Sequence, residues 1–166
     1  MKKKISILGS TGSIGKTLIN IINKDISNFE IKLLTAHKDH KTLLKQAKKF
    51  NVKYLIITDE NSYQIMKKKI KNLDIKLFNN FDCLKTIFKK KIDYTMSAII
   101  GLNGLKPTID MIRFSKKMAI ANKESIVCGW YLIKKELQKY KTEFIPVDSE
   151  HFSIWFALLN NKLKNI

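Results

Sequence analysis

The chain has 166 residues, 45% of them hydrophobic, which is enough apolar material to bury one core and argues against a disordered protein. Its formal net charge is +18, but the lysines are spread through nearly every segment and arginine occurs only at Arg113. Proteins that read nucleic acids usually cluster arginine with lysine, so the charge is better explained by a lysine-rich composition than by a specific nucleic acid partner.

Short apolar runs alternate along the chain with segments whose apolar residues recur at helical spacing. In chain order, this pattern predicts strand 5–8, helix 14–22, strand 29–34, helix 40–50, strand 54–57, helix 61–70, strand 75–78, helix 82–88, strand 94–99, helix 105–114, strand 118–121, helix 125–140, strand 144–147 and helix 152–159. Such alternation is typical of parallel strands joined by crossover helices. We therefore expect an α/β fold, with a Rossmann-like, doubly wound, mostly parallel sheet and helices on both faces.

The first strand-to-helix turn, Gly9-Ser10-Thr11-Gly12-Ser13-Ile14-Gly15, holds three of the six glycines in the chain. Glycine at such a turn lets the backbone approach a pyrophosphate and lets a helix start close against a strand. The spacing is G-x-x-G-x-x-G rather than the common G-x-G-x-x-G, and an ordinary glycine-rich turn is the alternative. The flanking strand and helix favour a dinucleotide-binding turn.

The end of the second predicted strand indicates which dinucleotide is preferred. A ribose 2'-hydroxyl is normally held by an acidic residue there. Residues 33–38 contain no carboxylate and instead present His37 and Lys38, while Asp39 lies beyond the expected position. Cationic side chains suit a 2'-phosphate, so we expect NADPH to be preferred over NADH.

Three further motifs follow the later strands. Residues 98–104 form a glycine-containing turn, and Asn122-Lys123-Glu124 places an amide, an ammonium and a carboxylate between a strand and a helix. A polar helix cap is the alternative explanation for this triplet. In the stretch PVDSEH, Asp148 and Glu150 are two residues apart, and on an extended chain they would project to the same side and could share one divalent cation.

The stretches GSTGSIG, SAIIGLNGLKPT, ANKESIV and PVDSEH occur in this order, and together they closely resemble the 1-deoxy-D-xylulose 5-phosphate reductoisomerase family. The resemblance extends over essentially the whole chain. It implies an NADPH-dependent enzyme of non-mevalonate isoprenoid synthesis. Such an enzyme rearranges the carbon skeleton of its sugar phosphate and reduces the product to 2-C-methyl-D-erythritol 4-phosphate.

The resemblance also implies roles for individual residues. Contacts to the cofactor would come from Thr11, Gly12, Ser13 and Ile14 at its phosphates, Lys38 at the 2'-phosphate, and Asn122 and Glu124 near the nicotinamide. The residues acting on substrate would be Lys123, Ser149 and Glu150, with Asp148 and Glu150 holding Mg²⁺ or Mn²⁺. Ligation by oxygen alone suits these hard cations better than zinc.

The sequence differs from the family pattern in two respects. His37-Lys38-Asp39 stands where the family often has Gly-Lys-Asn, and the Asp39 carboxylate would mildly repel a 2'-phosphate. Family members also continue into a catalytic domain with a third metal carboxylate and a grip for the substrate phosphate. We therefore expect residues 1–145 to form the NADPH-binding domain and residues 146–166 to begin a catalytic domain. We also expect this chain alone to be inactive, and the full-length enzyme to be a homodimer.

Two other functions remain open at this stage. Another NADP-dependent oxidoreductase, such as a semialdehyde dehydrogenase, would need a catalytic cysteine, but neither Cys83 nor Cys128 has a neighbouring base or a glycine-rich context. A basic nucleic-acid-binding protein is the second alternative. No apolar run is long enough to cross a membrane, and the isolated thiols suit a reducing environment, so we expect a cytoplasmic protein.

Overall fold

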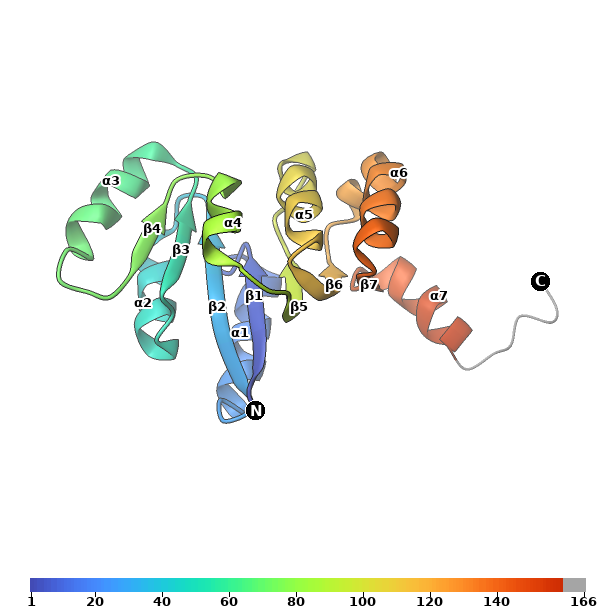
Figure 1. The fold of residues 1–166 in the computed structure, drawn as a ribbon, viewed down its shortest axis with the longest axis horizontal. Coiled ribbons are helices and arrows are strands. Elements are labelled where there is room, and N and C mark those ends of the chain that lie inside the picture. Colours follow the sequence, from blue (N-terminus) through green and yellow to red (C-terminus); the bar gives the residue numbers. More distant parts are fainter. Residues whose placement is uncertain (160–166) are drawn as a thin grey trace.

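The computed structural model of the chain describes residues 1–159, which form a single parallel sheet covered by helices (Figure 1). The strand order is β4-β3-β2-β1-β5-β6-β7, and every neighbouring pair runs parallel. The strands are β1 Lys3–Leu8, β2 Phe29–Ala36, β3 Tyr54–Ile57, β4 Lys76–Phe78, β5 Ile92–Ser97, β6 Ser115–Ile120 and β7 Glu143–Pro146. The expected doubly wound α/β fold is confirmed.

The helices divide between the two faces of the sheet. Their bounds are α1 Ser13–Lys24, α2 His40–Phe50, α3 Glu60–Lys69, α4 Leu84–Ile87, α5 Leu105–Ile112, α6 Lys123–Tyr140 and α7 Ser149–Leu159, with short 3₁₀ turns η1 Phe81–Cys83 and η2 Leu102–Gly104. Buried residues of α1, α2 and α3 share one apolar cluster with the sheet, and those of α4, α5 and α6 share the other. Among the described residues, no helix combines the length and apolar character needed to cross a bilayer.

The strands carry apolar side chains on both faces, which is why helices must cover both. In β1, Ile7 packs into the cluster beneath α1–α3 while its neighbour Leu8 packs into the opposite cluster, and both are fully buried. Successive strand residues point to opposite faces, so a continuous apolar run exposes neither face to water. Burial of each such side chain contributes roughly 1.5–3 kcal/mol.

The chain reverses its winding direction at β1. This strand pairs with β2 on one side and with β5 on the other. Strands β2 to β4 extend the sheet outward from one side of β1, and strands β5 to β7 extend it outward from the other side. In open parallel sheets this switch point leaves a crevice beyond the carboxyl ends of the strands, where ligands bind. The glycine turn after β1 and the loop after β5 therefore flank the expected binding position.

Several boundaries differ from the sequence-based expectation. Strand β5 ends at Ser97, earlier than expected, because Ala98 begins a loop that includes Gly101 at a φ of +70°. Helix α6 begins at Lys123, where Asn122 caps it. The last helix, α7, begins at Ser149 rather than at residue 152, so Ser149 and Glu150 are helical rather than extended.

Candidate functional site

A cleft of about 710 Å³ lies beyond the carboxyl ends of β1, β2 and β5, at the switch point of the sheet. Its wall combines the glycine turn, the end of β2, the residue after β3, and the loop after β5 with the first turn of α5. The residues that line it are Gly9, Thr11, Gly12, Thr35, Ala36, His37, Thr58, Phe81, Ala98, Ile99, Ile100, Leu102, Asn103, Lys106 and Pro107. The cleft is large enough to hold a nucleotide, since ligand pockets typically measure about 300–1,000 Å³.

The glycines of the first turn serve different purposes. Gly9 has a φ of +80°, and a Cβ there would lie 2.7 Å from the carbonyl oxygen of Ala98. A Cβ on Gly15 would lie 2.3 Å from the oxygen of Gly9. Gly12, in contrast, has ordinary dihedrals, and a Cβ on it would meet only the oxygen of Gly9, at 3.5 Å. The fold requires glycine at positions 9 and 15, whereas the bare backbone at Gly12 is left open to the cleft.

The amino end of α1 is open to an anion. Gly12 is its N-cap residue and offers no side chain to the free N–H groups, and the first turn contains no acidic residue. Such a helix end carries partial positive charge and unpaired donors. Of the four residues expected at the cofactor phosphates, Thr11 and Gly12 line the cleft, while Ser13 and Ile14 are exposed on the first turn of α1.

The segment after β2 places its three polar side chains differently. His37 lines the cleft, and its Nδ1 atom lies 2.9 Å from the hydroxyl of Thr58. Lys38 is exposed. The Asp39 carboxylate accepts a hydrogen bond of 3.0 Å from the N–H of Thr42 and so caps α2. Partial burial raises the pKa of Asp39, but the hydrogen bonding of Thr42 and the charges of Lys16 and His40 together outweigh that effect and leave the pKa below its ordinary value. The Asp39 carboxylate is therefore held at the amino end of α2 as its cap.

Asn122 connects the loop after β5 to the start of α6. Its buried amide nitrogen donates to the carbonyl oxygens of Ile99 (2.5 Å) and Gly101 (2.6 Å), and its Oδ1 accepts from the N–H of Ser125 (2.9 Å). Both amide hydrogens are thus used within the protein. The polar-cap explanation holds for this residue, which in addition fixes a wall of the cleft. Glu124, expected near the nicotinamide, is exposed in the first turn of α6.

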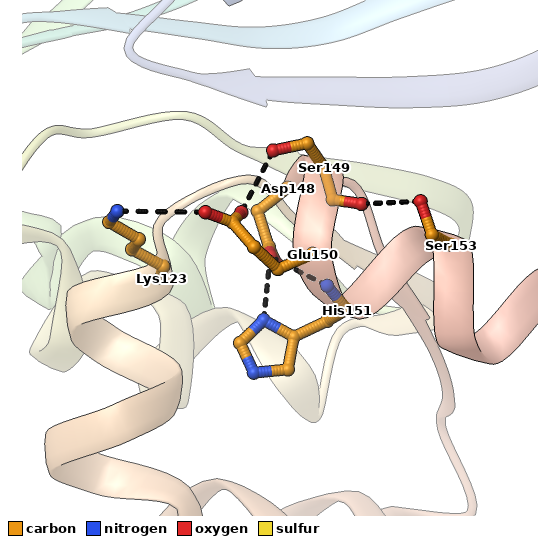
Figure 2. A network of polar contacts seen from close by, with 6 residues as sticks. All are labelled: Lys123, Asp148, Ser149, Glu150, His151 and Ser153. Carbon is orange, nitrogen blue, oxygen red and sulfur yellow. Dashed lines mark hydrogen bonds and ion pairs between the residues drawn. The ribbon is translucent and has the colours of Figure 1, made fainter.

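The three residues expected to act on substrate lie together at the ends of two adjacent strands (Figure 2). Lys123 opens α6 after β6, while Ser149 and Glu150 open α7 after β7. The Lys123 Nζ atom is 3.9 Å from Glu150 Oε1, and the Ser149 hydroxyl donates to Glu150 Oε2 over 2.8 Å. The Ser149 hydrogen bond, helped by the charge of Lys123, holds the pKa of Glu150 below its ordinary value.

Asp148 precedes α7 and caps it. Its Oδ1 accepts from the N–H of His151 (3.0 Å) and lies 2.6 Å from His151 Nδ1. Its carbonyl oxygen accepts from the N–H of Phe152, which completes the pattern of an N-cap residue. Burial opposes ionisation of Asp148, but the hydrogen bonds and the charge of His151 together outweigh it and lower the pKa of Asp148. The prediction that Asp148 and Glu150 lie two apart on an extended chain is therefore wrong, because the cap turns the chain into a helix between them.

The second oxygen of Asp148 has no hydrogen-bond partner although it is buried. The Asp148 side chain is 7% exposed, and its Oδ2 atom contacts neither solvent nor a donor. A buried carboxylate oxygen without a partner is costly unless something else satisfies it. The Glu150 side chain is 63% exposed, and the charge of Asp148 offsets a small part of the lowering of its pKa, so the two carboxylates are close enough to interact. Within residues 1–159, no group of three His, Cys, Asp or Glu is positioned to hold a metal ion.

The sequence patterns indicate the turn at residues 98–104 but assign no role to its apolar side chains, and none to Phe81. Ile100 and Leu102 are large apolar side chains that line the cleft and are exposed to water, and Phe81 approaches from η1. The stretch IIGLNG contains a signal for the first two, because glycines flank apolar residues that a surface loop does not need. Phe81 gave no such signal, because its place in the cleft depends on how η1 packs against the sheet.

The chain matches a family model described as 1-deoxy-D-xylulose 5-phosphate reductoisomerase over residues 5–129. It is 62% identical over 165 residues to the protein of that name from Pelagibacter ubique (strain HTCC1062), covering 98% of this chain and 42% of that protein. Among solved structures, the Zymomonas mobilis enzyme in complex with NADPH superposes with a TM-score of 0.83 at 34% identity, covering 91% of this chain and 40% of that one.

A second solved structure, of DOX-P reductoisomerase in complex with NADPH, fosmidomycin and magnesium, superposes with a TM-score of 0.82 at 30% identity. The match covers 90% of this chain and 37% of that one. The chain thus spans about two fifths of the length of the relatives that it matches. Since the family model covers most of the chain, and the fold agrees with both structures, the chain belongs to the 1-deoxy-D-xylulose 5-phosphate reductoisomerase family.

Proposed function

We propose that this chain supplies the NADPH cleft and two metal-binding carboxylates of an enzyme that converts 1-deoxy-D-xylulose 5-phosphate to 2-C-methyl-D-erythritol 4-phosphate. The observation that carries the proposal is the position of two sites at one edge of the sheet. The cleft opens beyond β1, β2 and β5, while Lys123, Ser149 and Glu150 gather beyond β6 and β7. Reduction requires the hydride donor and the sugar phosphate to be in contact, so their two sites must be neighbours.

The residues present fit NADPH. The cofactor phosphates would lie against Thr11, Gly12, Ser13 and Ile14, where the α1 helix end is uncapped and Gly12 leaves the backbone bare. Lys38 would meet the 2'-phosphate. Asn122 and Glu124 begin the helix on the far side of the cleft, and Asn122 would act there by holding residues 99–101 in place.

The carboxylates fit a hard divalent cation. Asp148 offers the buried, unpartnered Oδ2 and Glu150 offers an exposed carboxylate, so Mg²⁺ or Mn²⁺ would be held by oxygen alone. When bound, NADPH supplies the hydride, and the cation stabilises the negative charge that develops on the substrate oxygens. Lys123 would hold an anionic group of the substrate, and the Ser149 hydroxyl would donate a hydrogen bond to a substrate oxygen.

The remaining parts of the proposal concern organisation. Residues 1–145 would form the NADPH-binding domain and residues 146–166 the start of the catalytic domain, although strand β7 includes Pro146. The whole enzyme would be a cytoplasmic homodimer. A semialdehyde dehydrogenase is disfavoured because Cys83 is buried, with its pKa raised to about 11 by that burial, and neither Cys83 nor Cys128 lines the cleft.

Gly12→Ala tests the cofactor site. The added methyl group meets only the oxygen of Gly9 at an ordinary contact distance, so the melting temperature should change little. It would occupy space that the proposal gives to the cofactor, so the dissociation constant for NADPH should rise by about tenfold or more, measured by isothermal titration calorimetry. Unchanged NADPH binding in Gly12→Ala, or no binding by the wild-type chain, would contradict the proposed cofactor site.

A further inference from the structure

Gln46 is a buried polar residue outside every motif of the sequence. It lies in α2, with 7% of its surface exposed, among the apolar residues that pack this helix against the sheet. Its Nε2 donates to the carbonyl oxygen of Ser10 over 2.9 Å, and its Oε1 accepts from the Ser10 hydroxyl over 2.8 Å. A single side chain thus holds the carbonyl and the hydroxyl of one residue in the glycine turn.

Strand β2 holds the same turn from another direction. The N–H of Gly9 donates to the hydroxyl of Thr35 (2.9 Å), and the N–H of Ser10 donates to the carbonyl oxygen of Thr35 (2.9 Å). These bonds fix the chain up to the Ser10 nitrogen. The orientation of the next peptide unit, between Ser10 and Thr11, is fixed from α2 by Gln46.

The N–H of that peptide unit, which belongs to Thr11, is free. In a trans peptide the carbonyl oxygen and the following N–H point in opposite directions. Because Gln46 draws the Ser10 carbonyl toward α2, the Thr11 N–H must point away from α2. Among the described residues this N–H has no hydrogen-bond partner, and Thr11 lines the cleft. A donor held in one direction without a partner is suited to an anion.

We propose that Gln46 is a positioning residue of the phosphate-binding turn, which fixes the Ser10–Thr11 peptide so that the Thr11 N–H is presented to a cofactor phosphate. The inference rests on the proposed NADPH site and adds to it a residue that does not touch the cofactor. The phosphates concerned are common to NADPH and NADH. Gln46 therefore governs affinity for both cofactors and leaves the preference between them to the segment that contains Lys38.

The test compares four variants of the 166-residue chain. Gln46→Met keeps the length of the side chain but removes both bonds to Ser10. Ser10→Ala removes the contacts of the hydroxyl with Gln46 and with the carbonyl oxygen of Thr35 and leaves the bond from Gln46 to the Ser10 carbonyl. Leu43→Ala, in the same helix and fully buried, lowers stability without touching the turn. Lys38→Ala changes the expected 2'-phosphate site. Each variant is titrated with NADPH and with NADH by calorimetry, well below its melting temperature, and amide hydrogen exchange is measured without ligand.

We expect Gln46→Met to raise the dissociation constants for both cofactors by a similar factor of about tenfold. The hydrogen-bonded amides on either side of the peptide, those of Ser10 and Gly12, should exchange faster. Ser10→Ala and Leu43→Ala should change both constants by less than about threefold. Lys38→Ala should weaken NADPH binding alone. A merely structural role for Gln46 predicts that Leu43→Ala, the more destabilised variant, loses at least as much affinity.

Wild-type affinity in Gln46→Met would overturn the inference and leave the proposed function intact. Equal losses in Gln46→Met and Leu43→Ala would also overturn it. If the wild-type chain binds neither cofactor, the proposed function fails, and hydrogen exchange alone then decides about the turn. Unchanged exchange at both Ser10 and Gly12 in Gln46→Met would show that Gln46 does not position this peptide.

Discussion

The ammonium group of Lys123 lies 3.9 Å from the carboxylate of Glu150, although the two residues are far apart in the chain. They meet because β6 and β7 are parallel neighbours, so the segments that follow both strands leave the sheet at the same edge. The asparagine of the first segment, Asn122, also holds the loop after β5. One edge of the sheet therefore connects the cleft wall, the Lys123 ammonium and the carboxylates.

We expect the chain to bind NADPH more tightly than NADH, and Lys38→Ala to reduce that difference. Lys38 is exposed and carries a positive charge, whereas the Asp39 carboxylate is held by the N–H of Thr42 at the start of α2. Loss of one charge-assisted contact corresponds to about a tenfold weaker affinity for NADPH. Calorimetric titration with both cofactors measures it, with Lys45→Ala, on the exposed side of α2, as the control. Equal affinities in the wild-type chain would remove the role of Lys38.

Asn122→Asp should destabilise the fold although it preserves the helix cap. The Asp side chain can still accept from the N–H of Ser125, but it has no amide hydrogens for the carbonyls of Ile99 and Gly101. Two buried acceptors would then face a carboxylate, and leaving such groups unsatisfied costs about 1–3 kcal/mol each. Urea unfolding should show a loss of at least about 2 kcal/mol. A loss confined to Asn122→Ala, with Asn122→Asp stable, would show that the cap matters and the loop contacts do not.

Asp93 should make the fold more sensitive to acid. The Lys116 hydrogen bond (2.8 Å), together with the N–H of Lys4 (2.9 Å), lowers the pKa of Asp93 from its ordinary value of 3.8. A depressed pKa in the folded state adds stability above the unfolded pKa, and that stability is lost as pH falls through the folded pKa. Asp93→Asn should therefore cost about 0.5–1 kcal/mol at neutral pH.

The same difference should shrink below about pH 4, where Asp93 of the unfolded chain becomes protonated. Asp74→Asn is the matched control, because Asp74 also pairs with a lysine, Lys53, but is 82% exposed. It should change stability little at any pH. A difference for Asp93→Asn that stays constant between pH 7 and pH 3 would rule out ionisation as its cause.

The order of elements could be predicted because each segment carries its own periodicity. The bounds of α2 and β3 agree with the expectation, since apolar spacing and flanking polar residues mark both ends of each. Strand β6 begins at Ser115, three residues earlier than expected, because Ser115 and Lys117 pair with residues of β5 although the first three residues of the strand are polar. That pairing leaves no apolar signal.

The candidate site could be predicted only where one motif contains it. The glycines of residues 9–15 indicate a phosphate-binding turn from the sequence alone. Gln46 belongs to no sequence motif, because it contacts the turn only when α2 packs beside it. The prediction that Asp148 and Glu150 project to the same side of an extended chain was wrong for a different reason. A carboxylate after a strand can be a ligand or a helix cap, and the sequence does not reveal which oxygen is engaged by His151.

The isolated 166-residue chain should self-associate through α7. Ile154 and Phe156 are 62% and 55% exposed, and Phe152 stacks on Phe156 without being covered. Exposed apolar surface of this kind promotes association in water. Sedimentation velocity should give a mass above 19.3 kDa that falls toward it in an Ile154→Lys/Phe156→Lys variant. A chain that stays monomeric at high concentration would show that α7 is not an adhesive surface.

The last prediction is that the 166-residue chain binds Mn²⁺ weakly and shows no reductoisomerase turnover. Asp148 offers a cation one free oxygen because His151 engages the other, and Glu150 is already paired with Lys123 and Ser149. Mn²⁺ and Mg²⁺ prefer about six oxygens, and no third carboxylate joins these two within residues 1–159. The dissociation constant should be on the order of 10⁻⁴–10⁻³ M, measured by electron paramagnetic resonance of free Mn²⁺.

Turnover should be absent because these residues alone do not position the substrate. Correct positioning can supply roughly 7–11 kcal/mol of barrier lowering, and Lys123 and Ser149 offer only two contacts toward it. NADPH oxidation is followed by absorbance with the sugar phosphate and Mn²⁺ present, and Asp148→Asn is the control. Asp148→Asn should weaken Mn²⁺ binding further without altering NADPH affinity, because Asp148 lies outside the cleft lining. Turnover by the wild-type chain that disappears in Asp148→Asn would contradict this prediction. It would mean that copies of this chain complete the metal site for one another, with Asp148 and Glu150 as its carboxylates.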